Sequence, residues 1–250
     1  MKVLKYALLV IFAISFTKIY AQNTIVNGEV GVYLGPTFFQ GDYGEAGNSK
    51  SSTSNVGVGF GIAYVMNFSD SRYRSNFFST LADHIKERVE FSYAKIKLDH
   101  NPVPVVDANP EYDNFKAMKG ETKITNLGLM SEIYISSISR SPSNFKPYLL
   151  TGISMSWASP DINSSMPIPS AYITGNQKIF LKKQSSLSFS YGVGTRYSLD
   201  NVDLVLEMNM RSFSSDRIDG LDPEVSGDKS NDSTVSFRFG AVFHLDNGRR

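Results

Sequence analysis

Histidine is the side chain most suited to proton transfer at neutral pH, and the chain has three, His84, His100 and His244. No two of them stand at a spacing that would let them share a metal ion. We expect His244, on the polar face of the last predicted strand, to join a polar network rather than to act as a catalyst. No serine lies in a Gly-x-Ser-x-Gly context typical of hydrolases. The sequence therefore predicts no catalytic residue, no metal site and no cofactor.

Two other patterns contain the residue types of a ligand-binding motif, but the spacing of these residues argues against that motif in both cases. One late segment is rich in carboxylates, which could bind calcium: Asp216, Asp219, Asp222, Glu224 and Asp228. Their spacing lacks the EF-hand pattern, so we expect a solvated loop. The run Gly57-x-Gly59-x-Gly61 is not followed by a helical pattern, which argues against a dinucleotide-binding motif.

Eight charged residues share the same, less apolar face of the predicted strands. They are Glu29, Arg88, Glu90, Glu132, Arg196, Glu207, Arg211 and Arg238. Charges can lie away from water when they pair and hydrogen-bond, so four acids and four arginines predict a buried ion-pair network. We expect this network to plug the interior of a barrel; the alternative is a gated conduit or a proton path. The sequence does not say which residue pairs with which.

The segment 55–67 shows most clearly what positions these residues. Large apolar side chains occupy every second position, namely Val56, Val58, Phe60, Ile62, Tyr64 and Met66. A period of two indicates a β-strand. The alternate positions hold Gly57, Gly59, Gly61 and Ala63 instead of the polar residues of a soluble strand. One apolar face and one small face are typical of a strand in a small transmembrane barrel.

Eight segments alternate in this way, and no long helical pattern separates them. The predicted strands are near residues 28–38, 55–67, 86–98, 126–135, 147–157, 187–197, 202–211 and 235–245. Consecutive strands without crossover helices form hairpins, which predicts an all-β, eight-stranded antiparallel up-and-down transmembrane β-barrel. The connections after the first, third, fifth and seventh strands are long and are expected to be extracellular, whereas the turn at 199–201 is short. In the third strand the apolar residues change from odd positions, up to Tyr93, to even positions, from Ile96 onward. We therefore expect a bulge or the end of the membrane zone near Lys95.

The connection 69–86 is too long for an ordinary periplasmic turn. We expect a short helix at 77–86 within it, and either a docking element for a periplasmic partner or a simple spacer.

The total volume of the apolar side chains indicates which face of the strands points outward. The apolar faces carry about forty bulky side chains, but an eight-stranded barrel has an interior just wide enough to be filled. The apolar faces are therefore expected to contact outer-membrane lipid. A soluble secreted barrel is the alternative.

Composition and targeting signals agree with this interpretation. The chain has 250 residues, a formal charge of +1 and no cysteine, so we expect neither disulfides nor a nucleic-acid partner. Residues 1–21 have the basic start, short apolar run and small-residue end of a signal peptide, which leaves 22–250 as the barrel domain. No later apolar run approaches the roughly twenty residues of a transmembrane helix.

Several motifs resemble one family. The opening strand runs from Glu29 into a Gly41-Asp42 loop, Tyr191-Gly-Val-Gly-Thr-Arg-Tyr-Ser-Leu lies late in the chain, and an Asp216-x-x-Asp219 loop follows it. Together they resemble the PorG-like outer-membrane β-barrels of Bacteroidetes, with an OmpA/OmpX-like small-barrel architecture. This resemblance implies an integral outer-membrane protein. The best-known branch of the family is an accessory of type IX secretion that contacts periplasmic secretion-machinery proteins, and many other members have no assigned role. The alternative is a barrel that binds a small molecule or lipid, or a lipid-modifying enzyme, acting through its extracellular loops.

Overall fold

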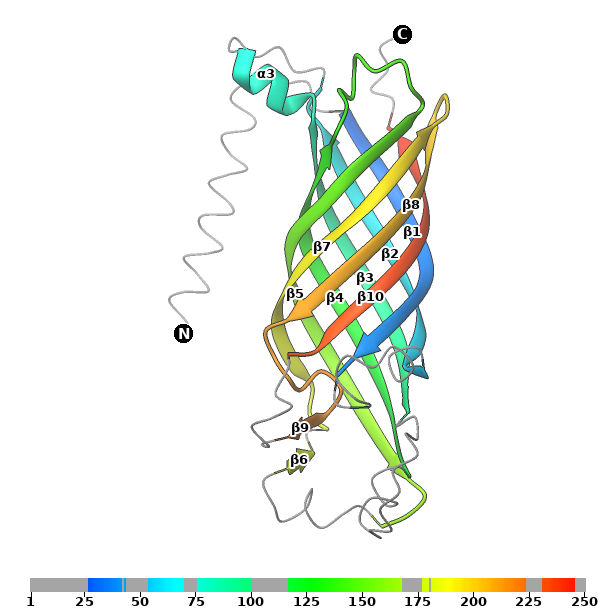
Figure 1. Cartoon of the computed structure of the whole chain (residues 1–250), viewed down its shortest axis with the longest axis vertical. Helices are drawn as coiled ribbons and strands as arrows, with labels where there is room; N and C mark the ends of the chain where they lie inside the picture. Colours follow the sequence, from blue (N-terminus) through cyan, green and yellow to red (C-terminus); the bar gives the residue numbers. More distant parts are fainter. Residues whose placement is uncertain are drawn as a thin grey trace, which may run out of the picture.

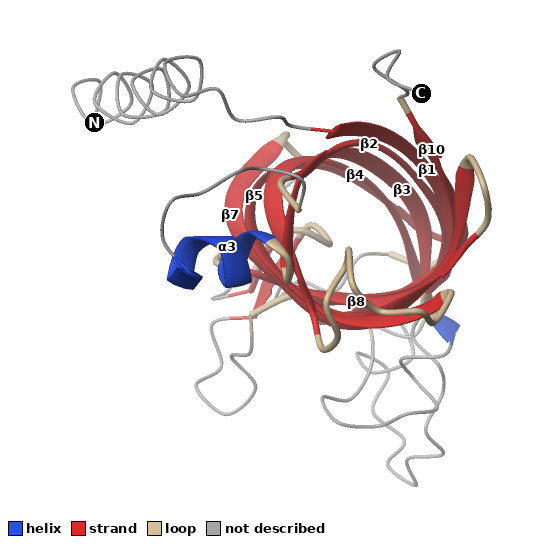
Figure 2. Cartoon of the chain, turned by 90° about the horizontal axis from the view of Figure 1, so that it is seen from above, coloured by secondary structure: helices blue, strands red, loops and turns tan. Residues whose placement is uncertain are grey.

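Eight long strands close into an antiparallel barrel (Figures 1 and 2). The computed structural model describes residues 27–41, 43, 54–69, 76–99, 117–167, 177–179, 181–223 and 231–245. The barrel strands are β1 (Asn27–Gln40), β2 (Val56–Asn67), β3 (Ile85–Asp99), β4 (Met118–Tyr134), β5 (Phe145–Ser164), β7 (Gln184–Ser198), β8 (Val202–Phe213) and β10 (Ser233–His244). Neighbours in sequence are neighbours in the barrel, and β1 pairs with β10 to close it. The predicted eight-stranded up-and-down barrel is confirmed.

The strands turn their apolar faces outward. On β8, Leu204 and Leu206 are 51% and 49% exposed, whereas the intervening Val205 and the next residue, Glu207, are 4% and 1% exposed. The same alternation holds on β2, where Ile62 is exposed and Ala63 is buried. An apolar outer surface around a charged interior is the reverse of a water-soluble protein and is typical of a membrane-spanning barrel. The described barrel therefore has the surface of an integral membrane protein.

The two ends of the barrel differ. One end carries the turn 199–201, closed by a 3.0 Å hydrogen bond from Leu199 N to Val202 O, together with α3 (Asn76–Ala82); we call it the short-turn end (Figure 1). The opposite, long-loop end carries a two-stranded sheet of β6 (Gln177–Ile179) and β9 (Leu221–Pro223). Both short strands lie in segments predicted as loops, because three residues are too few to show a period. β5 also continues to Ser164, beyond the predicted strand end.

The helix α3 is shorter than predicted. It ends at Ala82, and β3 begins at Ile85, so Lys86 belongs to the barrel and not to the helix. No helix in the described part of the chain has the length and apolarity to cross a membrane.

No bulge interrupts β3 near Lys95. The pairing with β4 continues without a break, as Lys95 lies opposite Lys123 and Ile96 opposite Thr122. Ile96 and Leu98 are completely buried and point into the barrel. The bulge prediction was wrong because the barrel interior itself becomes apolar at this level.

Several sequence predictions fall outside the described residues. They concern the signal peptide 1–21, His100, Glu224 and Asp228.

Candidate functional site

All eight charged residues singled out in the sequence point into the barrel and are buried. Their exposed fractions run from 0% for Arg88 and Glu132 to 8% for Arg211. Strand alternation explains this placement, because each residue has the inward parity of its strand. Lys86 on β3 and Asp203 on β8 are also buried in the same space, with 4% and 2% exposure. Their inward parity was visible in the sequence and could have identified them.

Arg88 lies at the centre of the network. Its Nη1 lies 3.1 Å from Glu132 Oε1 and 2.9 Å from Glu207 Oε2, and its Nη2 lies 3.3 Å from Glu90 Oε2. The Tyr33 ring lies 5.0 Å from the Arg88 guanidinium carbon, within cation–π range. One arginine on β3 therefore joins carboxylates from its own strand, β4 and β8.

Arg196 extends the network toward the short-turn end. Its Nη1 lies 2.7 Å from Glu29 Oε2 and its Nη2 lies 2.7 Å from Glu132 Oε2. The other oxygen of Glu29 accepts a 2.6 Å hydrogen bond from Lys86 Nζ. Asp203 Oδ2 lies 3.3 Å from Arg196 Nη1. These contacts connect β1, β3, β4, β7 and β8 through the interior.

Arg238 completes the network on the β10 side. Its Nη1 donates to Glu90 Oε1 at 2.6 Å, and it also donates to Glu207. The Tyr148 hydroxyl donates to Glu207 Oε2 at 2.7 Å, so this carboxylate binds two arginines and a tyrosine. Charges with several such partners are tolerated out of water. The arrangement holds the opposite walls of the barrel together.

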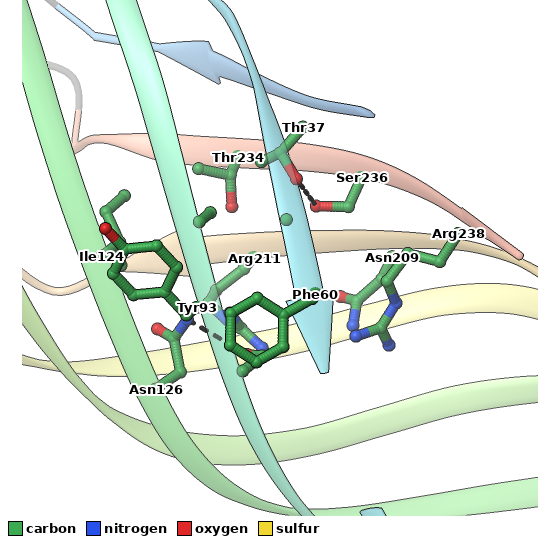
Figure 3. A pocket seen from close by; sticks show the side chains of 13 residues that line it. Thr37, Phe60, Tyr93, Ile124, Asn126, Asn209, Arg211, Thr234, Ser236 and Arg238 are labelled. Carbon is green, nitrogen blue, oxygen red and sulfur yellow. Dashed lines mark hydrogen bonds between the residues drawn. The ribbon is translucent and has the colours of Figure 1, made fainter. Parts of the chain in front are cut away.

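Arg211 differs from the other three arginines. Its Nε donates to Ser190 Oγ at 3.1 Å, and none of the described carboxylates forms an ion pair with it. The residue lies on the long-loop side of the network, next to a small cavity (Figure 3). The sequence predicted that Arg211 belongs to the network because it occupies an inward-facing position of its strand. In the structure it points inward but forms no ion pair with the described carboxylates.

A hydroxyl-rich layer lies beside this cavity. Ser188 Oγ shares 2.7 Å hydrogen bonds with both Ser154 and Ser156, and Ser156 donates to Asn126 Oδ1 at 2.6 Å. The Asn126 amide donates to Ser92 Oγ at 3.3 Å. Small hydroxyl side chains thus satisfy one another where the charged network ends.

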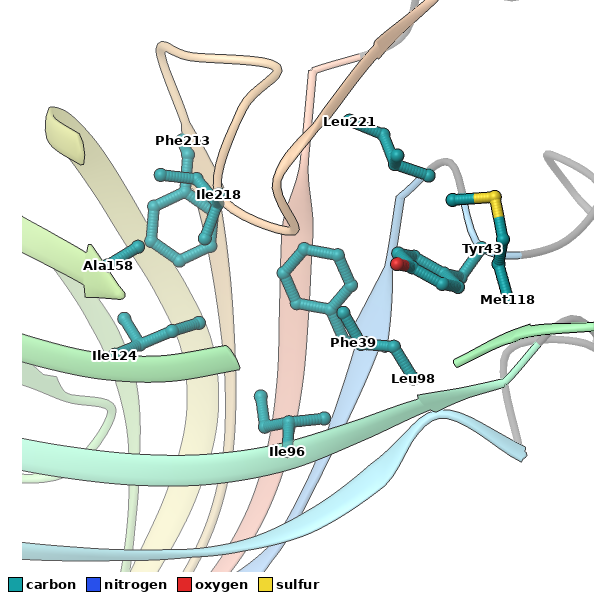
Figure 4. Packing of buried hydrophobic residues seen from close by; sticks show 10 residues of the cluster. All are labelled: Phe39, Tyr43, Ile96, Leu98, Met118, Ile124, Ala158, Phe213, Ile218 and Leu221. Carbon is teal, nitrogen blue, oxygen red and sulfur yellow. The ribbon is translucent and has the colours of Figure 1, made fainter. Parts of the chain in front are cut away.

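An apolar cluster closes the barrel interior at the long-loop end (Figure 4). We call it the plug; its buried members are Phe39, Tyr43, Ile96, Leu98, Met118, Ile124, Ala158, Phe213, Ile218 and Leu221. The segment 214–221 contributes Ile218 and Leu221, and two side chains fix it through the backbone of Ile218. Ile218 N donates to Asp232 Oδ2 at 2.7 Å, and Ile218 O accepts from Thr122 Oγ1 at 2.8 Å.

Within the described part of the carboxylate-rich segment, Asp219 does not lie in the solvated loop that the sequence predicted. Asp219 is completely buried, and its Oδ1 accepts a 2.9 Å hydrogen bond from Leu221 N. Gly220 has a φ of +91°, which lets the chain turn there over Pro160. The prediction failed for Asp219 because its carboxylate orders the turn that inserts the plug residues.

One group of side chains has the composition of a metal site. A ligand atom from each of Glu29, Asp203 and His244 lies within 4.8 Å of the others. Both Glu29 oxygens already bind cations, from Lys86 and Arg196, and Asp203 binds Arg196 as well. His244 Nε2 lies 3.3 Å from Asp203 Oδ1, as a member of the polar network. These contacts describe the end of the ion-pair network better than a metal centre.

The rim at the short-turn end holds α3 in place. After the helix, the Asp83 carboxylate accepts hydrogen bonds from the Ser137 hydroxyl and, at 2.9 Å, from Ser139 N. The backbone adds Ile138 N to Asp83 O at 2.8 Å. The helix nevertheless leaves Phe77 and Leu81, one turn apart, 69% and 44% exposed. A fixed element therefore presents an apolar pair at the rim.

Comparisons with known proteins concern the barrel architecture. No protein-family model matches the chain, and no curated protein matches it. Solved structures similar to it include neisserial surface protein A, at 14% identity over 86% of this chain and 96% of that one, with a TM-score of 0.47. A major outer membrane protein of Thermus thermophilus shares 11% identity over 87% and 99%, with a TM-score of 0.46. Ail of Yersinia pestis shares 14% identity over 87% and 98%, with a TM-score of 0.39. At these identities the likeness concerns the fold alone.

Proposed function

We propose that the chain is an integral outer-membrane barrel with a sealed interior, which serves as a structural docking protein and not as a pore. The observation that carries this proposal is the filling of the interior. The network around Arg88 and Arg196 connects six of the eight strands, β1, β3, β4, β7, β8 and β10. The plug then fills the long-loop end. Ions crossing the barrel would have to break buried, multiply bonded ion pairs.

Measurements of ion conductance and dye release test whether the barrel interior is sealed. The full chain is refolded in detergent and inserted into planar bilayers or into vesicles loaded with a small dye. We expect no single-channel steps and no dye release above the lipid background. A steady open conductance from the wild type would overturn the sealed interior.

The docking element in this proposal is α3 with its exposed Phe77 and Leu81. The hydrogen bonds of Asp83 hold the helix to the rim, so the pair is presented in a fixed position. Two apolar side chains one helical turn apart form a small apolar anchor of the kind used in helix-mediated recognition. The connection 69–86 faces the periplasm when the long loops are extracellular. A periplasmic protein is the partner that this position favours.

Co-purification tests the docking role. The barrel is tagged, solubilised from outer membranes in mild detergent, and compared with a Phe77→Ser, Leu81→Ser double variant. We expect the wild type to recover a periplasmic partner and the double variant to lose it while still folding. Leu199→Ser is the matched control, because Leu199 is an exposed apolar residue in the turn at the same end of the barrel and lies outside α3. Equal recovery by wild type and double variant would exclude α3 as the docking element.

A narrower form of the proposal is an accessory role in type IX secretion. It is supported by the resemblance of the Gly41-Asp42 and Asp216-x-x-Asp219 segments to the PorG-like barrels. In that case the recovered partners include components of a periplasmic secretion ring. Recovery of unrelated periplasmic proteins would keep the docking role and remove the secretion role.

The alternative function, a ligand-binding or lipid-modifying barrel, depends on the long-loop end. His84 and His244 both lie at the short-turn end, so a Ser/His pair at the long-loop rim would have to use His100. His100→Ala with an unchanged lipid profile of the outer membrane would argue against such chemistry.

A further inference from the structure

A cavity of about 30 Å³ lies inside the barrel between the ion-pair network and the plug (Figure 3). Its polar lining includes Thr37, Asn209, Arg211, Thr234, Ser236 and Arg238. No acidic side chain is among the described residues that line it. The lining thus combines two cations with neutral groups able to donate hydrogen bonds.

Arg211 gives the cavity a local positive charge. The side chain is buried, with 8% exposure, and only its Nε has a hydrogen-bond partner among the described residues. Arg238, by contrast, is neutralised by Glu90 and Glu207 on its other side. Arg211 forms no ion pair with a described residue, and a buried cation of this kind is unfavourable unless an anion or ordered water compensates it.

The neutral groups around the cavity can supply further donors. Thr37 and Ser236 share one hydrogen bond at 2.9 Å, which uses only one of their two hydroxyl protons. Asn209 Oδ1 is buried without a hydrogen-bond partner. A half-turn of the amide group would present its two N–H donors at this position and leave no acceptor unpaired there. Thr234 adds a third hydroxyl to the lining.

We propose that this cavity binds one small inorganic anion of halide size, chloride under physiological conditions, with Arg211 as its principal cationic contact. The volume admits one or two water-sized species. A halide ion is close to a water molecule in size and fits this space. Water could fill the same volume and accept hydrogen bonds from Arg211, but only an anion would also balance its charge.

Anomalous diffraction provides a test that needs no variant. The full-length wild type is refolded in sodium bromide, so that the anion is present when the interior closes, and then crystallised from the same salt. We expect a bromide peak in the cavity in contact with the Arg211 guanidinium. Well-ordered density with no anomalous peak at this position would show that the cavity holds water and would overturn the proposal.

Unfolding in matched salts tests the role of Arg211. Urea unfolding is followed in sodium chloride and in sodium gluconate at equal ionic strength, for wild type, Arg211→Met and Lys119→Met. Chloride at ten times its dissociation constant should lower the wild-type unfolding constant about tenfold relative to gluconate. Lys119→Met should keep this difference because Lys119 is an exposed cation, with 74% side-chain exposure. Arg211→Met should lose it.

The same chloride effect in Arg211→Met as in wild type would overturn the assignment of Arg211. If Arg211→Met does not fold, the bromide experiment on the wild type decides the proposal. Neither experiment depends on docking, so the anion site and the proposed function can fail separately.

Discussion

Arg196 and Glu132 form a two-point ion pair across the barrel interior. Arg196 Nη2 lies 3.0 Å from Oε1 and 2.7 Å from Oε2 of Glu132. The two residues belong to β7 and β4, which are separated in the barrel by β5. The contact therefore braces the barrel where no backbone hydrogen bond can.

Removing Arg196 should destabilise the barrel strongly. Arg196→Leu leaves Glu29, Glu132 and Asp203 without one of their cations, and breaking a buried pair typically costs about 3–5 kcal/mol. The free energy of unfolding is measured by urea titration in detergent micelles or lipid vesicles. Lys183→Leu, which replaces an exposed cation by leucine, should leave the midpoint almost unchanged. Equal midpoints for the two variants would show that the network contributes little to stability.

Gly194 makes room for the tyrosine that binds Glu207. A Cβ built on Gly194 would overlap Tyr148 Cζ, so Gly194→Ala must displace the ring and weaken its hydrogen bond to Glu207. We expect a loss of about 1–3 kcal/mol, as for other overpacked interiors. At Gly61 the nearest atom, Glu90 Cδ, is 3.6 Å away, so Gly61→Ala should be tolerated. The urea midpoints of the two variants give the comparison, and equal effects would contradict the close approach at Gly194.

The plug should control access to the segment 214–221. Ile218 is completely buried beside Phe39 and Phe213, and Ile218→Ala removes contacts that hold this segment in the barrel mouth. Truncation of a buried side chain of this size typically costs about 2–5 kcal/mol. The neighbouring Arg217 is exposed, so trypsin cleavage after it should become faster in the variant. Leu206→Ala, on the outward face, is the control and should not change this cleavage. Unchanged cleavage in Ile218→Ala would show that other contacts hold the segment.

Asp83 should make the short-turn rim sensitive to acid. Burial raises the pKa of the Asp83 carboxyl, but the hydrogen bonds from Ser137 and Ser139 outweigh it and hold this pKa below its ordinary value. A lowered folded-state pKa means that the carboxylate stabilises the rim fully above its ordinary pKa, near pH 4, and that this stabilisation is lost as the pH falls through the folded-state value.

Hydrogen exchange at the Ser139 amide measures this effect. Protection should be constant near neutral pH, after correction for the intrinsic exchange rate, and should fall below about pH 4. Asp83→Asn should exchange faster than wild type at neutral pH, where the wild-type side chain is ionised, because an amide cannot accept both hydrogen bonds as a carboxylate does, and the difference should shrink in acid. Retained protection in Asp83→Asn would mean that the backbone contacts alone hold the rim.

The sequence alone determined the architecture and the inward direction of the charged side chains in the network. A strand has a period of two, so the apolar set beginning at Val56 and the parity of residues such as Arg88 and Glu207 fix which face each occupies. The number of bulky apolar residues then requires that their face be the outer one, because an eight-stranded interior cannot hold them.

Only the tertiary structure decided the partners of the interior charges. Arg196 meets Glu29 from 167 positions away, and Arg88 meets Glu207 from 119. Such pairings depend on the closure between β1 and β10 and on side-chain reach across the interior, which no local pattern encodes. The same holds for the isolation of Arg211, whose inward parity equals that of Arg238, while only Arg238 reaches the carboxylates of Glu90 and Glu207. Likewise, Ile96 and Leu98 interrupt the alternation of polarity without interrupting the strand, because the plug makes the interior apolar at their level.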